Sequence, residues 1–96
     1  MNSERMMEAV RLVIHERERQ EVRKAEGRFQ YTCADDGMTN YEKIVVLMEE
    51  VGEAAQEALV LDGHRQARGA LGTEEGLRKE LIQVAAVAVA HIEALL

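Results

Sequence analysis

The clearest pattern in the chain is a helical alternation of apolar and polar positions over residues 41–61. Apolar side chains recur there at spacings of three and four residues, which is typical of one face of an α-helix. These side chains are Ile44, Leu47, Met48, Val51, Ala55 and Ala58. Glu49, Glu50 and Glu53 interrupt the same stretch. Carboxylates close to a core-facing stripe cost free energy unless a positive charge neutralises them, so the pattern predicts an amphipathic helix carrying an acidic group.

A second apolar stretch, residues 77–96, is interrupted in the same way by Glu80 and Gln83. Around the run VAAVAVA this segment is apolar on nearly every side, and a helix of that kind belongs in a protein interior. Three helices are too few to surround it, and its alanines allow close helix approach. We therefore expect a helical bundle that is completed by a homodimer or homotetramer.

Capping signals divide the chain into three helices. A first helix is expected to start at Ser3 and to end at Gly27, because glycine is the common residue just after a helix end. Thr39 and Glu42 form a capping box for the central helix. Thr73 is suited to cap the third helix.

Composition narrows the class of protein. The chain of 96 residues has no proline, only three aromatic residues and no strand pattern, which predicts a single all-α domain spanning residues 1–96. With 18 acidic and 12 basic residues, its net charge is −6. A nucleic-acid binder needs clustered lysine and arginine, so we expect no nucleic-acid partner.

The chain also gives no sign of membrane insertion or export. The first twenty residues are charged throughout and contain no continuous apolar region of the kind a signal peptide needs. The run VAAVAVA is far shorter than the about 20 residues of a membrane span. The single cysteine, Cys33, excludes an intrachain disulfide and fits a reducing compartment. We expect a cytoplasmic protein with no membrane partner.

The second half of the first helix, HERERQEVRKAEG, is almost wholly charged. One interpretation is a solvated face with weak ion pairs along the helix. The other is that side chains of this segment reach a ligand phosphate or base, and the candidates are Arg17, Arg19, Gln20 and Lys24.

The loop that follows contains or borders all the aromatic residues, Phe29, Tyr31 and Tyr41. These rings either pack down on the domain or stack on a planar ligand such as a nucleobase. Within the central helix, Gly52 costs about 1 kcal/mol of helix propensity relative to alanine. We expect it to allow close approach by another backbone or a ligand.

Together the two interrupted helices carry a recognisable pair of motifs. Carboxylate and amide oxygens gathered from facing helices suit a hard divalent cation such as Mg²⁺. The chain resembles the MazG-like all-α nucleoside triphosphate pyrophosphohydrolases, whose signature is EExxE on one helix and ExxD on the next. The matching segments here are Glu49-Glu50-Val51-Gly52-Glu53 and Glu80-Leu81-Ile82-Gln83.

The resemblance implies a metal site and a reaction. It implies Glu50, Glu53 and Glu80 as ligands of Mg²⁺, with Glu49 positioned to orient water or to assist the metal. Independently of the resemblance, we expect Mn²⁺ to substitute for Mg²⁺ and Glu49, or an acid beside it, to accept the proton of the water. The chain departs from the family at Gln83, where the signature has aspartate. An amide oxygen is a neutral and weaker ligand, so Gln83 either coordinates the metal weakly or is a core amide bonded to a neighbouring helix.

The implied activity is hydrolysis of a (d)NTP between the α and β phosphates, giving the (d)NMP and pyrophosphate in a house-cleaning role. Outer phosphates would be held by basic residues, for which the candidates are Arg65, Arg68, Arg78 and Lys79. His91 is either an ordinary partly buried histidine or a group that contacts the base. The alternatives are a non-catalytic helical module of the same fold, which binds nucleotide or protein, and a purely structural bundle.

Overall fold

The structure is a computed structural model that describes residues 3–66, 69 and 71–96. It contains three α-helices and, over these residues, no β-strand: α1 (Ser3–Ala25), α2 (Asn40–Leu61) and α3 (Glu74–Ala94). The prediction of an all-α fold is confirmed. None of the helices in the described part of the chain is long and apolar enough to cross a bilayer.

The helix ends lie where the capping signals predict them. At the start of α2, the Thr39 hydroxyl accepts a hydrogen bond from the Glu42 amide at 3.1 Å, and the Glu42 carboxylate accepts from the Thr39 amide at 2.9 Å. Thr73 accepts from the Gly76 amide at 2.9 Å at the start of α3. After α1, Gly27 adopts a φ of 81°, which a residue with a side chain rarely does.

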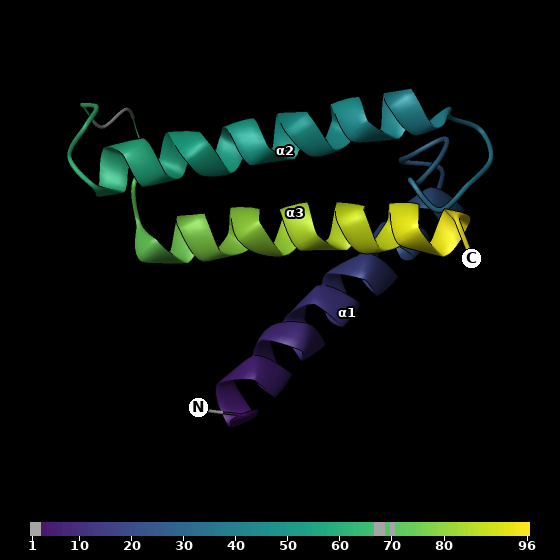
Figure 1. The fold of residues 1–96 in the computed structure, drawn as a ribbon, viewed down its shortest axis with the longest axis horizontal. Helices are drawn as coiled ribbons and strands as arrows, with labels where there is room; N and C mark the ends of the chain where they lie inside the picture. The colour runs from purple at the N-terminus through teal and green to yellow at the C-terminus, as the bar shows by residue number, and fades with distance from the viewer. Residues whose placement is uncertain (1–2, 67–68, 70) are drawn as a thin grey trace.

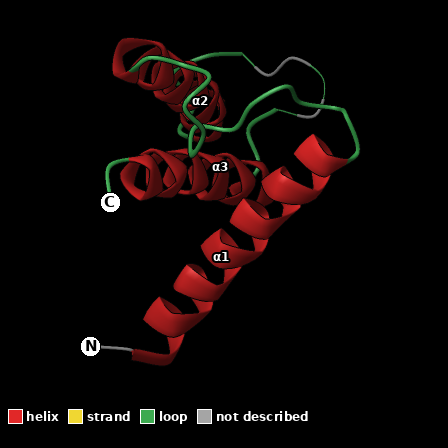
Figure 2. Cartoon of the chain, turned by 90° about the vertical axis from the view of Figure 1, so that its right-hand side faces the viewer, coloured by secondary structure: helices red, strands yellow, loops and turns green. Residues whose placement is uncertain are grey.

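The apolar helix α3 lies between the other two. It packs antiparallel to α2 along its length, and α1 crosses its C-terminal half and then diverges (Figures 1 and 2). Between the described parts of α1 and α2 there is no comparable packing. The loop after α1 folds over this end of the molecule, where Cys33 is buried against Val87 and Ala90.

The core is thin for a chain of this size. Among the residues that the structure describes, the buried apolar side chains are all small: Cys33, Ala54, Ala86, Val87 and Ala90. The radius of gyration is 14.7 Å, whereas a compact chain of this length has about 12.5 Å. The accessible surface is 7047 Å² for a mass of 10.8 kDa, against about 5,500 Å² for a typical monomer. The single chain is extended and exposes more surface than a compact domain.

Candidate functional site

Three glutamates from two helices converge at the α2–α3 seam. Glu50 and Glu53 come from successive turns of α2 and Glu80 from α3, and one carboxylate oxygen of each lies within 4.8 Å of the others. The antiparallel packing of α2 and α3 produces this convergence, because each motif lies near the middle of its helix. We refer to Glu50, Glu53 and Glu80 as the acidic cluster.

Gln83 is the fourth member of this neighbourhood. Its terminal amide lies 3.2 Å from Oε2 of Glu50 and 3.2 Å from Oε2 of Glu80. With the amide nitrogen at this position, Gln83 donates a hydrogen bond to each carboxylate. With the amide oxygen there, it adds a neutral ligand to the oxygens available to a cation. Either way, Gln83 lies directly against the acidic cluster.

The acidic cluster is electrostatically strained. Burial raises the pKa of Glu50, and the negative charges of Glu53 and Glu80 raise it further. Burial also raises the pKa of Glu80, together with a hydrogen bond shared with Glu53, while nearby Lys79 partly offsets the rise. Like charges held together resist ionisation unless a cation compensates them. The donor set, three carboxylates and an amide, fits the preference of Mg²⁺ for oxygen ligands.

Two further glutamates flank the cluster. Glu49 lies on the exposed side of α2 and outside the group of converging oxygens, although its charge also raises the pKa of Glu50. Glu16 approaches from α1, contributes to the same rise, and is held by two 2.8 Å hydrogen bonds from Arg19. The sequence patterns do not single out Glu16, because on its own helix it is one of many charged residues.

A cavity of about 420 Å³ opens directly beside the acidic cluster. The end of α1, the loop after it, and the facing sides of α2 and α3 form its walls. Its polar lining residues are Glu16, Arg19, Gln20, Arg23, Thr32, Glu50 and Gln83. Its other lining residues are Phe29, Tyr31, Cys33, Met38, Val46 and Val87. The cavity therefore joins the acidic cluster to a partly apolar, partly aromatic space.

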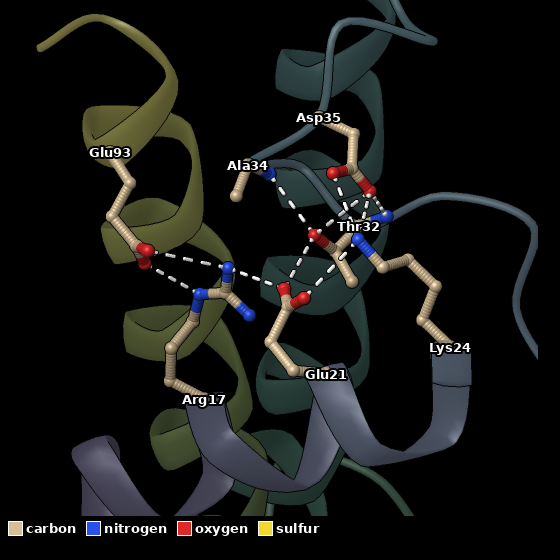
Figure 3. Close-up of polar contacts among 7 residues, drawn as sticks. All are labelled: Arg17, Glu21, Lys24, Thr32, Ala34, Asp35 and Glu93. Atoms are coloured by element: carbon tan, nitrogen blue, oxygen red, sulfur yellow. Dashed lines mark hydrogen bonds and ion pairs between the residues drawn. The ribbon is translucent and has the colours of Figure 1, made fainter. Parts of the chain in front are cut away.

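Of the residues predicted to bind substrate, Gln20 lines this cavity, but Arg17 and Lys24 do not. Arg17 is buried, and its guanidinium donates to Glu93 on α3 and to Glu21, each at 2.6 Å (Figure 3). Burial alone would lower the Arg17 pKa, but the hydrogen bonds to these two carboxylates outweigh it and raise the pKa. The charge of Arg17 is therefore used to bind α1 to α3 rather than to face the cavity.

Lys24 serves the loop in a comparable way. Its ammonium donates to both carboxylate oxygens of Asp35 at 2.9 and 3.0 Å and lies 3.2 Å from Glu21 (Figure 3). Asp35 also accepts a 2.8 Å hydrogen bond from the backbone amide of Thr32. The network fixes the chain direction just before Cys33, so Lys24 positions the loop that forms one wall of the cavity.

The remaining basic candidates are distributed around the site. Lys79 is exposed and, with Arg78 and Glu16, lines a shallow depression between α1 and α3. Arg65 is exposed in the loop after α2. Arg68 lies outside the described residues. Lys79 is thus the predicted phosphate-binding residue whose charge acts on the acidic cluster.

The aromatic residues separate into two groups. Phe29 and Tyr31 line the cavity, as a stacking role requires. Tyr41 does not, and it is 79% exposed. His91 forms a 2.9 Å contact with Asn40, which fits the interpretation of an ordinary histidine joining α3 to α2.

Within the described part of this chain, no backbone approaches Gly52, and approach by a ligand or by a second chain stays a prediction. A side chain built at Gly52 would meet no atom within 4 Å. The close approach occurs elsewhere, at Gly76, where an added Cβ would lie 2.9 Å from both carboxylate oxygens of Glu57. Gly52 faces outward because it follows the half-buried Glu50 by two positions, which turns it to the other side of α2.

Glu57 is a second acidic residue that the sequence patterns do not single out. It is buried, and its Oε2 accepts a 2.6 Å hydrogen bond from the Gly72 amide just before α3. Its position four residues after Glu53 places it on the same face of α2, which is the signal that would have identified it. Glu57 holds the loop against α2 and so helps to set the register of α3 and Glu80.

Comparisons with protein-family models, curated proteins and solved structures find no match for this chain. The fold and site therefore define only a class: an all-α protein with a glutamate cluster beside a cavity.

Proposed function

We propose that the protein is a Mg²⁺-dependent nucleoside triphosphate pyrophosphohydrolase, converting a (d)NTP to the (d)NMP and pyrophosphate. The observation that carries this proposal is the convergence of Glu50, Glu53 and Glu80, of which Glu50 also lines the cavity. These three carboxylates, with Gln83 as a fourth and weaker ligand, would hold the metal. Bound Mg²⁺ would neutralise the polyphosphate and lower the pKa of water.

Other residues around the acidic cluster and the cavity take the remaining roles in the proposed reaction. Glu49 is close enough to Glu50 to influence its protonation and remains open to solvent, so we assign it the role of accepting a proton from water. Lys79 lies beside the acidic cluster and is suited to bind the outer phosphates. Phe29 and Tyr31 supply aromatic surface for the base, and Gln20 an amide.

The motif resemblance supports the same reaction. The EExxE segment and the Glu80–Gln83 segment both contribute side chains to one place, which is what a MazG-like site requires. We accordingly propose a house-cleaning role on the cytoplasmic nucleotide pool.

The proposal includes a homodimer or homotetramer. Large apolar side chains are exposed on α1 and α3, and they include Met6, Met7, Val10, Ile14, Val89 and Ile92. An apolar groove of about 340 Å³ runs between these helices, with Val10, Ile14 and Val89 among its lining residues. A second copy of the chain would remove this surface from water.

The decisive experiment is pyrophosphate release from a panel of eight nucleoside triphosphates in the presence of Mg²⁺. We expect release from at least one nucleotide and its loss when EDTA replaces Mg²⁺. Glu53→Gln should lower kcat/KM by about 100-fold or more, because metal ligation supplies several kcal/mol to the transition state. Glu26→Gln, an exposed glutamate just after α1 and outside the cluster, is the matched control and should retain activity.

The position of Gln83 favours one second candidate, a non-catalytic nucleotide- or protein-binding module. An amide nitrogen that donates to both Glu50 and Glu80 relieves part of their repulsion without a cation. In that case the protein would bind nucleotide, measured by calorimetry, without releasing pyrophosphate. Absence of both nucleotide binding and a Mg²⁺-induced rise in melting temperature would leave only a structural bundle.

A further inference from the structure

One arginine of the cavity has no counter-ion. Arg23 lines the cavity from α1 and is half-buried. Within the part of the chain that the structure describes, its guanidinium makes no ion pair or hydrogen bond. Arg11, Arg17 and Arg19 on the same helix each bind at least one glutamate. In a protein of net charge −6, an unpaired cation at a cavity wall marks a place for ligand acceptor atoms.

The position of Arg23 along α1 indicates which part of a ligand it meets. Glu16 and Arg23 line the same cavity seven residues apart, or about 10 Å along a helix axis. Glu16 is the one next to Glu50, as its effect on that carboxyl shows. The proposed function places the phosphates at the acidic cluster. Arg23 then lies further along the cavity wall than Glu16, separated from the phosphates by about the length of the sugar, and therefore lies at the base.

The chemistry of a guanidinium then discriminates among bases. Arginine offers only hydrogen-bond donors, in a fixed planar fork. Along the edge of a purine that carries N7, guanine presents two adjacent acceptors, O6 and N7, whereas adenine places an amino donor beside N7. Phe29 and Tyr31 on the neighbouring wall provide aromatic surface for a purine ring.

We propose that Arg23 is a specificity-determining residue that selects guanine nucleotides by a bidentate contact with O6 and N7. This inference rests on the proposed function for the placement of the phosphates. It adds to that function the class of base and the residue that recognises it.

The test compares guanine with adenine nucleotides in the wild-type protein and in Arg23→Lys and Arg23→Gln. The wild type should favour GTP over ATP in kcat/KM, and GMP over AMP in calorimetric affinity. Both variants should lose about tenfold or more for guanine nucleotides and less than about threefold for adenine nucleotides. Lysine keeps the charge but not the planar fork, so it separates base recognition from simple attraction of phosphate.

Arg11→Gln is the matched control, because it removes a positive charge from the exposed part of the same helix. It should leave the guanine preference unchanged, and circular dichroism should show native helicity for all three variants. Equal losses for GTP and ATP in Arg23→Lys, or a wild type with no guanine preference, would overturn the inference. Guanine-selective binding of GMP that depends on Arg23, without hydrolysis of any triphosphate, would uphold it while refuting the proposed reaction.

Discussion

At the scale of single residues, folding disfavours the ionised forms of the Glu50 and Glu80 carboxyl groups. Both are pulled from water and placed beside other carboxylates, so the pKa of each lies above its ordinary value of 4.5. An acid with a raised pKa in the folded state binds its proton more tightly there than in the unfolded chain. The stabilisation from this tighter proton binding is fully present at pH values below the pKa of the unfolded chain. It is lost as the pH rises through the higher pKa of the folded protein.

We predict that the cation-free protein melts at a higher temperature at pH 5 than at pH 8. Glu50→Gln should remove part of this dependence, raising the melting temperature at pH 8 by a few degrees and having little effect at pH 5. Mg²⁺ at pH 8 should stabilise the wild type more than the variant. Differential scanning fluorimetry in EDTA and in Mg²⁺ measures all three effects, and a wild type equally stable at both pH values would contradict the electrostatic argument.

At the scale of elements, α1 is held to α3 by one buried cation. Arg17 is 8% exposed and binds Glu93 across the helix interface, as well as Glu21 on its own helix. One of its nitrogens, Nη1, is buried without a hydrogen-bond partner in the described chain. A buried polar group with incomplete bonding is costly, so the two carboxylates must retain their position for α1 to stay docked.

We predict that Arg17→Met lowers the free energy of unfolding by about 1–3 kcal/mol, because it removes hydrogen bonds to charged groups at the α1–α3 interface. Urea denaturation followed by circular dichroism at 222 nm is the measurement. Arg11→Met, an exposed position on the same helix, should stay within about 0.5 kcal/mol of the wild type. Equal effects of the two substitutions would show that Arg17 does not anchor α1.

At the scale of the whole molecule, the large accessible surface area of the single chain favours an oligomer. The chain exposes about 1,500 Å² more than a compact monomer of its mass. A standard interface covers about 800 Å² on each partner, so one or two self-contacts would account for the excess. The exposed apolar residues of the groove between α1 and α3 are the natural place for such a contact.

We predict that the wild type sediments as a dimer or tetramer and that Val10→Asp combined with Ile14→Asp shifts it to the monomer. Both side chains are more than half exposed and line the groove, and burying two carboxylates in an apolar contact is strongly unfavourable. Analytical ultracentrifugation at micromolar concentration measures the change. Arg11→Asp replaces the ion-pair partner of Glu8 with a carboxylate outside the groove. It should not dissociate the oligomer, and a monomeric wild type would refute the interface.

The local signals were sufficient for the elements and for part of the site. The capping box at Thr39, the glycine after α1 and the apolar spacing of α2 and α3 depend on contacts within a few residues, so sequence predicts them well. The convergence of Glu50 and Glu80 was also predictable, because each interrupts the apolar pattern of its helix and so lies near the seam between the two helices.

The roles of the charged residues on α1 were decided only in three dimensions. Arg17, Arg19 and Arg23 are indistinguishable by type and lie within two turns of one helix. Arg17 reaches Glu93, 76 positions away in the sequence, Arg19 is held by Glu16, and Arg23 is left at the cavity wall. Helix formation fixes the spacing of these side chains from local bonds alone. Which of them is paired and which faces the cavity depends on how α1 crosses α3, and that angle is set by packing between distant parts of the chain.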